Sequence, residues 1–174
     1  MKRYLRYFIP KLQTSEVGFS LVEVLVSLMI ISLFIGLSMQ AFLIAVILKA
    51  RAEQQDEAAN WIQEDLEFIK HQAREYEKNA YPYSAKCSAT DVANGVAASL
   101  LNDSVGGIGG NPKTDGPRIL GGVPFVLTRN ADYANSFDPF NLLKITYQVT
   151  AQTGGKTIAT LSTEIVPDAA LKCP

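Results

Sequence analysis

The sequence has little of what catalysis or metal binding requires. Its 174 residues contain one histidine, His71, and two cysteines, Cys87 and Cys173, which form no C-x-x-C pair. A zinc site needs several such side chains held together, and a nucleophile activated by histidine must lie beside that histidine. We therefore expect no catalytic residue, no metal site and no cofactor, and we expect His71 to be a solvated residue on a charged helix.

Nucleotide-binding motifs are absent as well. Seven of the 12 glycines fall within residues 106–122, GGIGGNPKTDGPRILGG, but their order is neither G-x-G-x-x-G nor a P-loop. This stretch is predicted to be a flexible surface loop. Residues 130–141 are predicted to be a second loop.

Charge is absent from the 25 residues 24–48, whereas a helix needs about 20 apolar residues to cross a bilayer. Four of the 16 Lys and Arg residues lie in residues 1–18, together with one of the 17 Asp and Glu residues. The positive-inside rule keeps this basic end in the cytoplasm and predicts a single-pass membrane protein with its head outside. The rest of the chain is net acidic, which disfavours general binding to nucleic acid.

Proline is absent between Pro10 and Pro82, and Gly36 is the only glycine within residues 19–78. A single continuous helix is therefore predicted over residues 19–78. Its second half is polar but carries an apolar stripe at steps of four and three, the spacing of an amphipathic helix. The stripe consists of Ala58, Ile62, Leu66, Ile69, Ala73 and Tyr76. A helix this polar needs a cover, so later strands are expected to pack on the stripe.

Two segments near the C-terminus alternate between apolar and polar residues, which is the pattern of half-buried strands. They are residues 142–152 and 157–166, and the sequence TGGK between them predicts a hairpin. Residues 123–129 are a third predicted strand, and Asp91 is expected to cap a short helix that ends at Asn102. The predicted fold class is α+β, with a long N-terminal hydrophobic and amphipathic helix packed on a small C-terminal antiparallel sheet.

Both cysteines lie in the part of the chain predicted to be exported. An even count in an oxidising compartment favours one disulfide, Cys87–Cys173, and two unpaired buried thiols are the alternative. In the chain-entropy treatment, a bond that closes a loop of this length stabilises the fold by about 4–5 kcal/mol.

The apolar segment contains one acid, Glu23, in the run GFSLVEVLVSL at residues 18–28. A secretory signal cut after Ala52 matches A-x-A, but its apolar region exceeds the usual length of about 7–15 residues. A plain membrane anchor would hold Glu23 near the cytoplasmic interface. A cut between Gly18 and Phe19 explains more, because the new amine of a neighbouring copy can neutralise Glu23. Such head-to-tail contacts build a filament, so we favour this interpretation.

The run Gly18-Phe19-Ser20-Leu21-Val22-Glu23 resembles the prepilin-type cleavage and methylation motif of type IV pilins and of type II secretion pseudopilins. The longer run FSLVEVLVSL is most similar to minor pilins of the PilV kind. The resemblance implies that a prepilin peptidase cuts after Gly18 and methylates the amine of Phe19. It also implies that Glu23 takes part in docking to other subunits.

In this family a C-terminal disulfide often frames the variable head, which agrees with Cys87 and Cys173. Two features depart from the family pattern. Glu16 and Val17 precede Gly18, where a basic residue is common, and the apolar helix lacks the proline of major pilins. A helix without that proline favours a minor component over a major subunit.

The resemblance implies four parts of the chain. These are a leader at residues 1–18, a transmembrane and filament-core helix at 19–48, an amphipathic helix of the head at 49–79, and a globular head at 80–174. The implied partners are other pilin subunits, which bind through the N-terminal helix, the prepilin peptidase, and the inner-membrane pilus assembly machinery. The chain is expected first in the inner membrane, as a single pass, and after assembly in the pilus at the cell surface.

The predicted function is that of a minor pilin that primes or modifies a type IV pilus, and three alternatives remain. A secretion pseudopilin shares the same assembly chemistry; a calcium site would favour it, but Asp132, Asn135 and Asp138 match no metal motif. A tip-displayed adhesin or DNA receptor needs a local basic patch, for which Lys113 and Arg118 are candidates. An enzyme is the weakest alternative, because the single histidine has no nucleophile predicted beside it.

Overall fold

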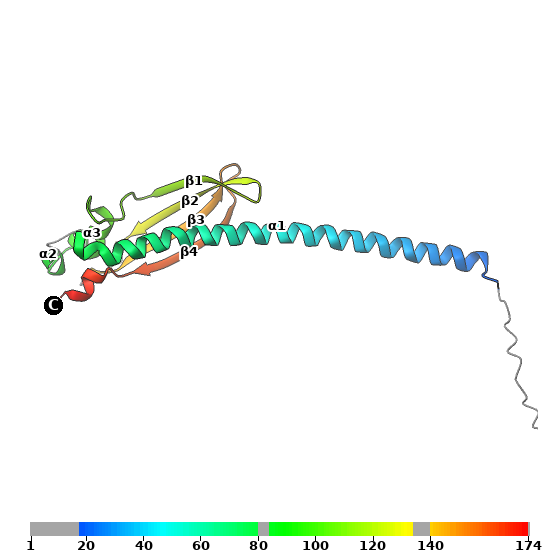
Figure 1. The fold of residues 1–174 in the computed structure, drawn as a ribbon, viewed down its shortest axis with the longest axis horizontal. Helices are drawn as coiled ribbons and strands as arrows, with labels where there is room; N and C mark the ends of the chain where they lie inside the picture. Colours follow the sequence, from blue (N-terminus) through cyan, green and yellow to red (C-terminus); the bar gives the residue numbers. More distant parts are fainter. Residues whose placement is uncertain (1–17, 80–83, 134–139, 174) are drawn as a thin grey trace, which may run out of the picture. The chain divides into compact units, whose positions relative to one another are not determined.

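The computed structural model describes residues 18–79, 84–133 and 140–173, so residues 1–17 of the predicted leader lie outside the described part, as do Asn135 and Asp138. The chain divides into two compact units, Met1–Val46 and Ile47–Pro174. The fold class is α+β as predicted, because a long helix, α1, packs against a four-stranded antiparallel sheet (Figure 1).

Helix α1 spans Leu21–Asn79, which confirms the single helix predicted over residues 19–78. The carbonyl of Ser20 starts it by accepting hydrogen bonds from the N–H groups of Glu23, at 2.9 Å, and Val24, at 3.2 Å. Within the apolar part, the hydroxyl of Ser27 donates to the carbonyl of Glu23 at 2.7 Å. Such local bonds satisfy a hydroxyl without a distant partner, so this serine is compatible with an apolar surrounding.

The predicted stripe on α1 is the helical side of the head's core. All six predicted residues are buried, and Trp61 joins them. Across from them lie the inward-facing residues of the sheet and the short helix α3, Val96–Asn102. The buried hydrophobic residues of the described chain all fall between Ala58 and Ala170, so the second unit has a core of its own.

The sheet has the strand order β1-β2-β3-β4, with every neighbouring pair antiparallel. Strands β2 (Val123–Asp132), β3 (Leu143–Ala151) and β4 (Thr157–Ile165) confirm the three predicted strands. Because β2 continues to Asp132, the loop predicted at residues 130–141 begins later than expected. Gly154 and Gly155 form the turn between β3 and β4 with φ of +84° and +62°, a conformation that suits glycine.

Strand β1, Lys113–Leu120, is absent from the sequence prediction, which made residues 106–122 a flexible loop. The prediction was wrong there because β1 has no alternating pattern: only Leu120 is buried. Gly116 and Pro117 also interrupt it, and its register against β2 shifts between Asp115 and Arg118. An edge strand of this kind is held by pairing with β2 rather than by burial of its own side chains.

The segment before β1 differs from the predicted capped helix. Asp91 accepts a hydrogen bond from the N–H of Ala93 at 3.3 Å, but it caps only the short 3₁₀ helix η1, Val92–Asn94. Helix α3 begins anew after Gly95, where a Cβ atom would lie 2.5 Å from the Cβ of Phe140. The close approach of Phe140 therefore requires glycine at this position, and the extended backbone of Gly95, with ψ of 171°, separates the two helices. Helix α2 (Ser84–Cys87) precedes them, and η2 (Asp168–Lys172) follows β4.

Candidate functional site

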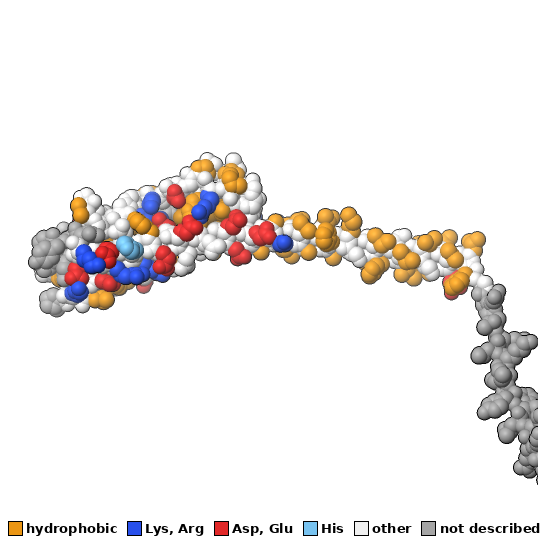
Figure 2. All heavy atoms as spheres, viewed as in Figure 1, with side chains coloured by type: hydrophobic (Ala, Val, Ile, Leu, Met, Phe, Trp, Pro, Cys, Tyr) orange, Lys and Arg blue, Asp and Glu red, His pale blue; other side chains and the backbone are white. Residues whose placement is uncertain are grey.

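The apolar segment, residues 19–48, is the candidate assembly surface. Every side chain in it is exposed, including Phe19 at 82% and Phe34 at 71%. Figure 2 shows hydrophobic side chains along this part of α1, whereas charged ones gather over the head. Soluble monomers rarely expose a continuous apolar surface of more than a few hundred Å². This surface therefore requires lipid or protein around it.

The three residues of the predicted processing and docking motif lie together at the start of α1. Among the described residues, and apart from its chain neighbours, no atom lies within 4 Å of the position of a Cβ on Gly18, and Phe19 is the most exposed large hydrophobic residue. Glu23 is the one acid in the first turn, where the helix dipole favours a negative charge. Within the described residues its carboxylate has no ion-pair partner, so a cation from outside this part of the chain can reach it.

Helix α1 is long and apolar enough to cross a membrane, with a mean hydropathy of 2.4 over 18 residues of its apolar part. A signal sequence near an N-terminus has the same length and apolar composition as a membrane span, so these two properties do not separate the two. Glu23 in the first turn sets this segment apart from an ordinary membrane span, because most membrane spans keep acidic residues out of their apolar region.

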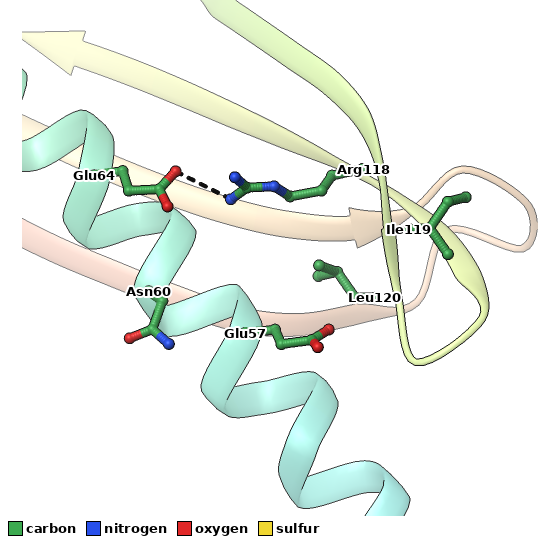
Figure 3. Close-up of a pocket in the computed structure, with 6 residues that line it drawn as sticks. All are labelled: Glu57, Asn60, Glu64, Arg118, Ile119 and Leu120. Carbon is green, nitrogen blue, oxygen red and sulfur yellow. Dashed lines mark hydrogen bonds and ion pairs between the residues drawn. The ribbon is translucent and has the colours of Figure 1, made fainter.

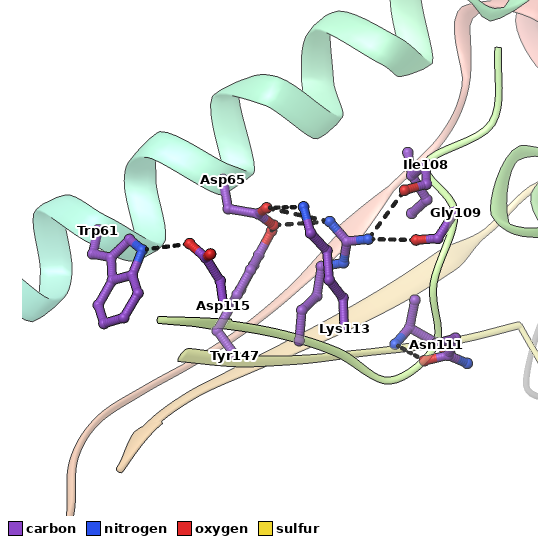
Figure 4. Close-up of polar contacts among 10 residues, drawn as sticks. Trp61, Asp65, Ile108, Gly109, Asn111, Lys113, Asp115 and Tyr147 are labelled. Carbon is purple, nitrogen blue, oxygen red and sulfur yellow. Dashed lines mark hydrogen bonds and ion pairs between the residues drawn. The ribbon is translucent and has the colours of Figure 1, made fainter. Parts of the chain in front are cut away.

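A polar cluster inside the head holds α1 on the sheet. Arg129 on β2 is 1% exposed, and its guanidinium donates to both carboxylate oxygens of Asp65 on α1, at 3.0 and 3.3 Å. The same guanidinium donates to the carbonyls of Ile108 and Gly109, at 3.2 and 2.8 Å. The hydroxyl of Tyr147 on β3 donates to Asp65 at 3.0 Å, and Figure 4 shows these groups converging on the carboxylate.

This cluster shifts the protonation of its members. Burial alone would raise the pKa of Asp65, but the hydrogen bond and charge of Arg129, the Tyr147 hydroxyl and the charge of Lys113 outweigh it, so the pKa is lowered. Burial, and then the negative charge of Asp65, raise the pKa of Tyr147. Asp65 is therefore an anion and Tyr147 a neutral donor at ordinary pH, which is the arrangement a structural cluster needs.

The basic residues considered for nucleic acid binding are both paired with acids on α1. Lys113 lies 3.4 Å from Asp65, and Arg118 lies 3.1 Å from Glu64. Arg118 also lies over the ring of Trp61, whose Nε1 donates to Asp115 at 3.2 Å. The Arg118 pair crosses a hollow of about 290 Å³ between α1 and β1 (Figure 3). Its lining residues are Glu57, Asn60, Glu64, Arg118, Ile119 and Leu120.

The predicted disulfide is confirmed: Cys87 and Cys173 are bonded, with their Cα atoms 5.3 Å apart. Beside it, Lys86 contacts both the hydroxyl of Tyr76 and the carboxylate of Asp103, and Tyr76 donates to Asp103 at 2.6 Å. These contacts link the end of α1 to α2 and to the loop after α3. The disulfide therefore joins Cys173 to α2, and the polar group joins α2 and Asp103 to α1.

The remaining candidates are dispersed. His71 is exposed on α1, as expected. In the part of the chain that the structure describes, no three His, Cys, Asp or Glu side chains form a group able to hold a metal ion. Asp132, the described member of the calcium candidates, is the last residue of β2.

These features define a pilin-like architecture: an apolar N-terminal helix continues into the helix of a small head, which packs on a four-stranded antiparallel sheet and carries a C-terminal disulfide. Comparisons with known protein families, with curated proteins and with solved structures find no match.

Proposed function

We propose that the protein is a minor pilin, a structural subunit that primes or modifies a type IV pilus. The observation that supports this most is an exposed apolar segment, free of charge over residues 24–48, that is preceded in the first turn of α1 by Glu23, four residues after Phe19 and five after Gly18. The self-contained head supports the proposal too, because a displayed domain must fold without help from the apolar segment.

Pairing of charges explains why an acid is kept in an apolar helix. A carboxylate in the middle of a membrane helix costs about 2.5–3.5 kcal/mol on insertion scales, and less near the interface. A cut after Gly18 gives each subunit a free amine at Phe19, which in a neighbouring subunit can neutralise Glu23. Each subunit then offers one amine and one acid, so the contact repeats from subunit to subunit and extends a filament.

The proposed partners follow from this chemistry. A prepilin peptidase would cut after Gly18 and methylate Phe19, other pilin subunits would surround residues 19–48, and the assembly machinery of the inner membrane would extract the helix. No step in this role needs catalysis by the chain itself or a bound cofactor. The head would lie outside the cytoplasm and reach the cell surface with the fibre.

The test uses the full chain in its own cells. We expect mass spectrometry of the extracted protein to find an N-terminus at Phe19 with one added methyl group. We expect Glu23→Ala and Glu23→Gln to enter the membrane normally but to fall at least tenfold in fibres sheared from the cells. Ser27→Ala, one turn further along the same helix, is the matched control and should assemble as the parent does.

The same experiment separates a pilus from a secretion pseudopilus. Recovery of the head in sheared external fibres supports a pilus, and retention in the periplasm with loss of a secreted protein supports a pseudopilus. A mature chain that begins at Met1, or a Glu23→Ala variant that assembles fully, contradicts the assembly role in either system.

A further inference from the structure

The two outer strands of the sheet are protected unequally. Natural proteins block free strand edges with proline, bulges or charges, because unpaired backbone groups accept other strands. Strand β1 has such protection, since Gly116 and Pro117 interrupt it and its register shifts at that point. Strand β4 has one register shift against β3, near its start between Thr157 and Ala159, and pairs in an unbroken register from Ala159 to Ile165. Within the described residues no segment pairs with its other edge.

The free edge of β4 is also nearly without charge. From Thr157 to Thr163 it carries no ionised side chain, and Glu164 lies opposite Lys144 of the neighbouring strand. In an antiparallel strand, alternate residues turn their N–H and C=O groups away from the paired neighbour. Among the residues that the structure describes, the edge of β4 therefore presents a row of unpaired donors and acceptors that an extended, uncharged segment complements.

An apolar hollow of about 240 Å³ lies directly beside this edge, between β4 and α1. Ala59 and Ile62 of α1 line one side, and Ala159 and Leu161 of β4 line the other. Small-molecule pockets usually measure about 300–1,000 Å³, so this hollow fits a single side chain better than a ligand. Leu161 is 37% exposed, so α1 leaves part of this apolar side chain uncovered.

We propose that the edge of β4 binds an extended segment of a different protein by strand addition, with one apolar side chain of that segment in the hollow. Backbone hydrogen bonds supply the affinity in such contacts, and pockets for alternate side chains supply the specificity. This inference goes beyond the proposed pilin role and does not depend on the pairing of Glu23.

A second copy of this chain is a poor occupant. Its β1 edge is interrupted and makes a poor donor strand. Two β4 edges can pair in one antiparallel sheet only through a twofold axis perpendicular to that sheet. Since α1 lies along the sheet (Figure 1), this axis would direct α1 of the two heads in opposite directions. Two chains whose α1 helices enter one membrane in the same direction cannot have these helices pointing in opposite directions.

The first test measures backbone hydrogen exchange by mass spectrometry. The full chain is recovered from its own cells by mild extraction, and a second sample is stripped of bound proteins with urea and refolded. We expect amides of β4 to exchange at least tenfold more slowly in the recovered sample, while those of β1 exchange equally in both. Equal exchange at β4 in the two samples, or equal slowing at both edges, overturns the proposal.

A second test introduces Thr160→Pro and, separately, Leu161→Pro. Of two adjacent residues, one directs its N–H to β3 and the other directs it to the free edge, so at most one of the two prolines leaves the pairing with β3 intact. The variant that keeps the melting temperature of the parent is the one whose proline lies at the outward-facing position. That variant should lose the slow exchange of β4, whereas Thr160→Ala, which keeps its N–H, should retain it. A folded proline variant that stays protected contradicts strand addition. Disulfide cross-linking between two copies that carry Thr160→Cys would name this chain as the occupant and overturn the inference.

Discussion

Arg129 and Asp65 form a buried ion pair that fixes α1 on the sheet, with Nη1 of the arginine 3.0 Å from Oδ2 of the aspartate. The same guanidinium is bonded to the carbonyls of Ile108 and Gly109, so one side chain joins the helix, a strand and the loop before β1. Any sliding of α1 along the sheet would leave the arginine charge buried without its counterion, and such a state is strongly unfavourable. The pair therefore sets the position of the helix on the sheet more strictly than apolar contacts do.

Asp65→Asn is expected to lower the free energy of unfolding of residues 47–174 by about 3 kcal/mol, because it leaves Arg129 buried with an uncompensated charge. Urea denaturation followed by circular dichroism, with the disulfide intact, measures the change. Glu64→Gln, one residue away, breaks the exposed pair with Arg118 and should cost at most about 1 kcal/mol. Equal losses in the two variants would show that burial of the Asp65 pair contributes nothing.

Acid should remove the contribution of Asp65. Its pKa in the folded head is below the ordinary value of 3.8, so its contribution is complete above that value and is lost as the pH falls through the lower folded pKa. The unfolding free energy of the parent should therefore fall more steeply below about pH 4 than that of Asp65→Asn. Parallel curves for the two proteins would contradict the pKa shift.

Tyr147→Phe removes the hydroxyl that donates to Asp65. The expected loss is about 1.5–3 kcal/mol, because hydrogen bonds to charged groups are the stronger ones. Without this donor the pKa of Asp65 moves back toward its ordinary value, so the acid transition should begin at a higher pH than in the parent. Tyr133→Phe is the control, because Tyr133 also packs against the core but takes no part in this cluster. A Tyr147→Phe head as stable as the control would exclude the role of the hydroxyl.

Loss of the disulfide should destabilise the head. The double substitution Cys87→Ser with Cys173→Ser is expected to lower the free energy of unfolding by about 2–5 kcal/mol, as for native disulfides in small exported domains. Thermal unfolding of residues 47–174 with and without a reducing agent provides the comparison. The reductant should reproduce the effect in the parent and have no effect on the double variant. A head that is equally stable in all four conditions would show that the bond is dispensable.

The parts of the fold that could be predicted from the sequence are those whose apolar residues recur at the regular spacing of a helix or a strand. The stripe from Ala58 to Tyr76 is buried at every predicted position, because one helical face meets one sheet. Strand β3 buries its alternate residues for the same reason. Strand β1 has no such period, since an edge strand outside the core can carry Gly116 and Pro117 and still pair with β2.

The polar cluster was missed although the sequence contains a signal for it. Arg129 continues the alternation of Phe125 and Leu127 on β2, so its side chain points inward with theirs. An arginine at an inward position requires an acid opposite it. Asp65, which directly precedes Leu66 of the stripe, was the nearest candidate. No local pattern could identify Tyr147 as the third member, because that contact joins residues 82 positions apart.

The ring closed by Cys87 and Cys173 contains all four strands, whereas α1 lies entirely before it. Tension that enters through α1 and leaves through any strand must divide at Cys87 between the two arms of this ring. The two segments of the ring on either side of the loaded strand then share the force. Neither segment can extend fully while the other remains folded. Under force applied through α1, the extension of such a domain would thus be limited to the length of the shorter segment of the ring.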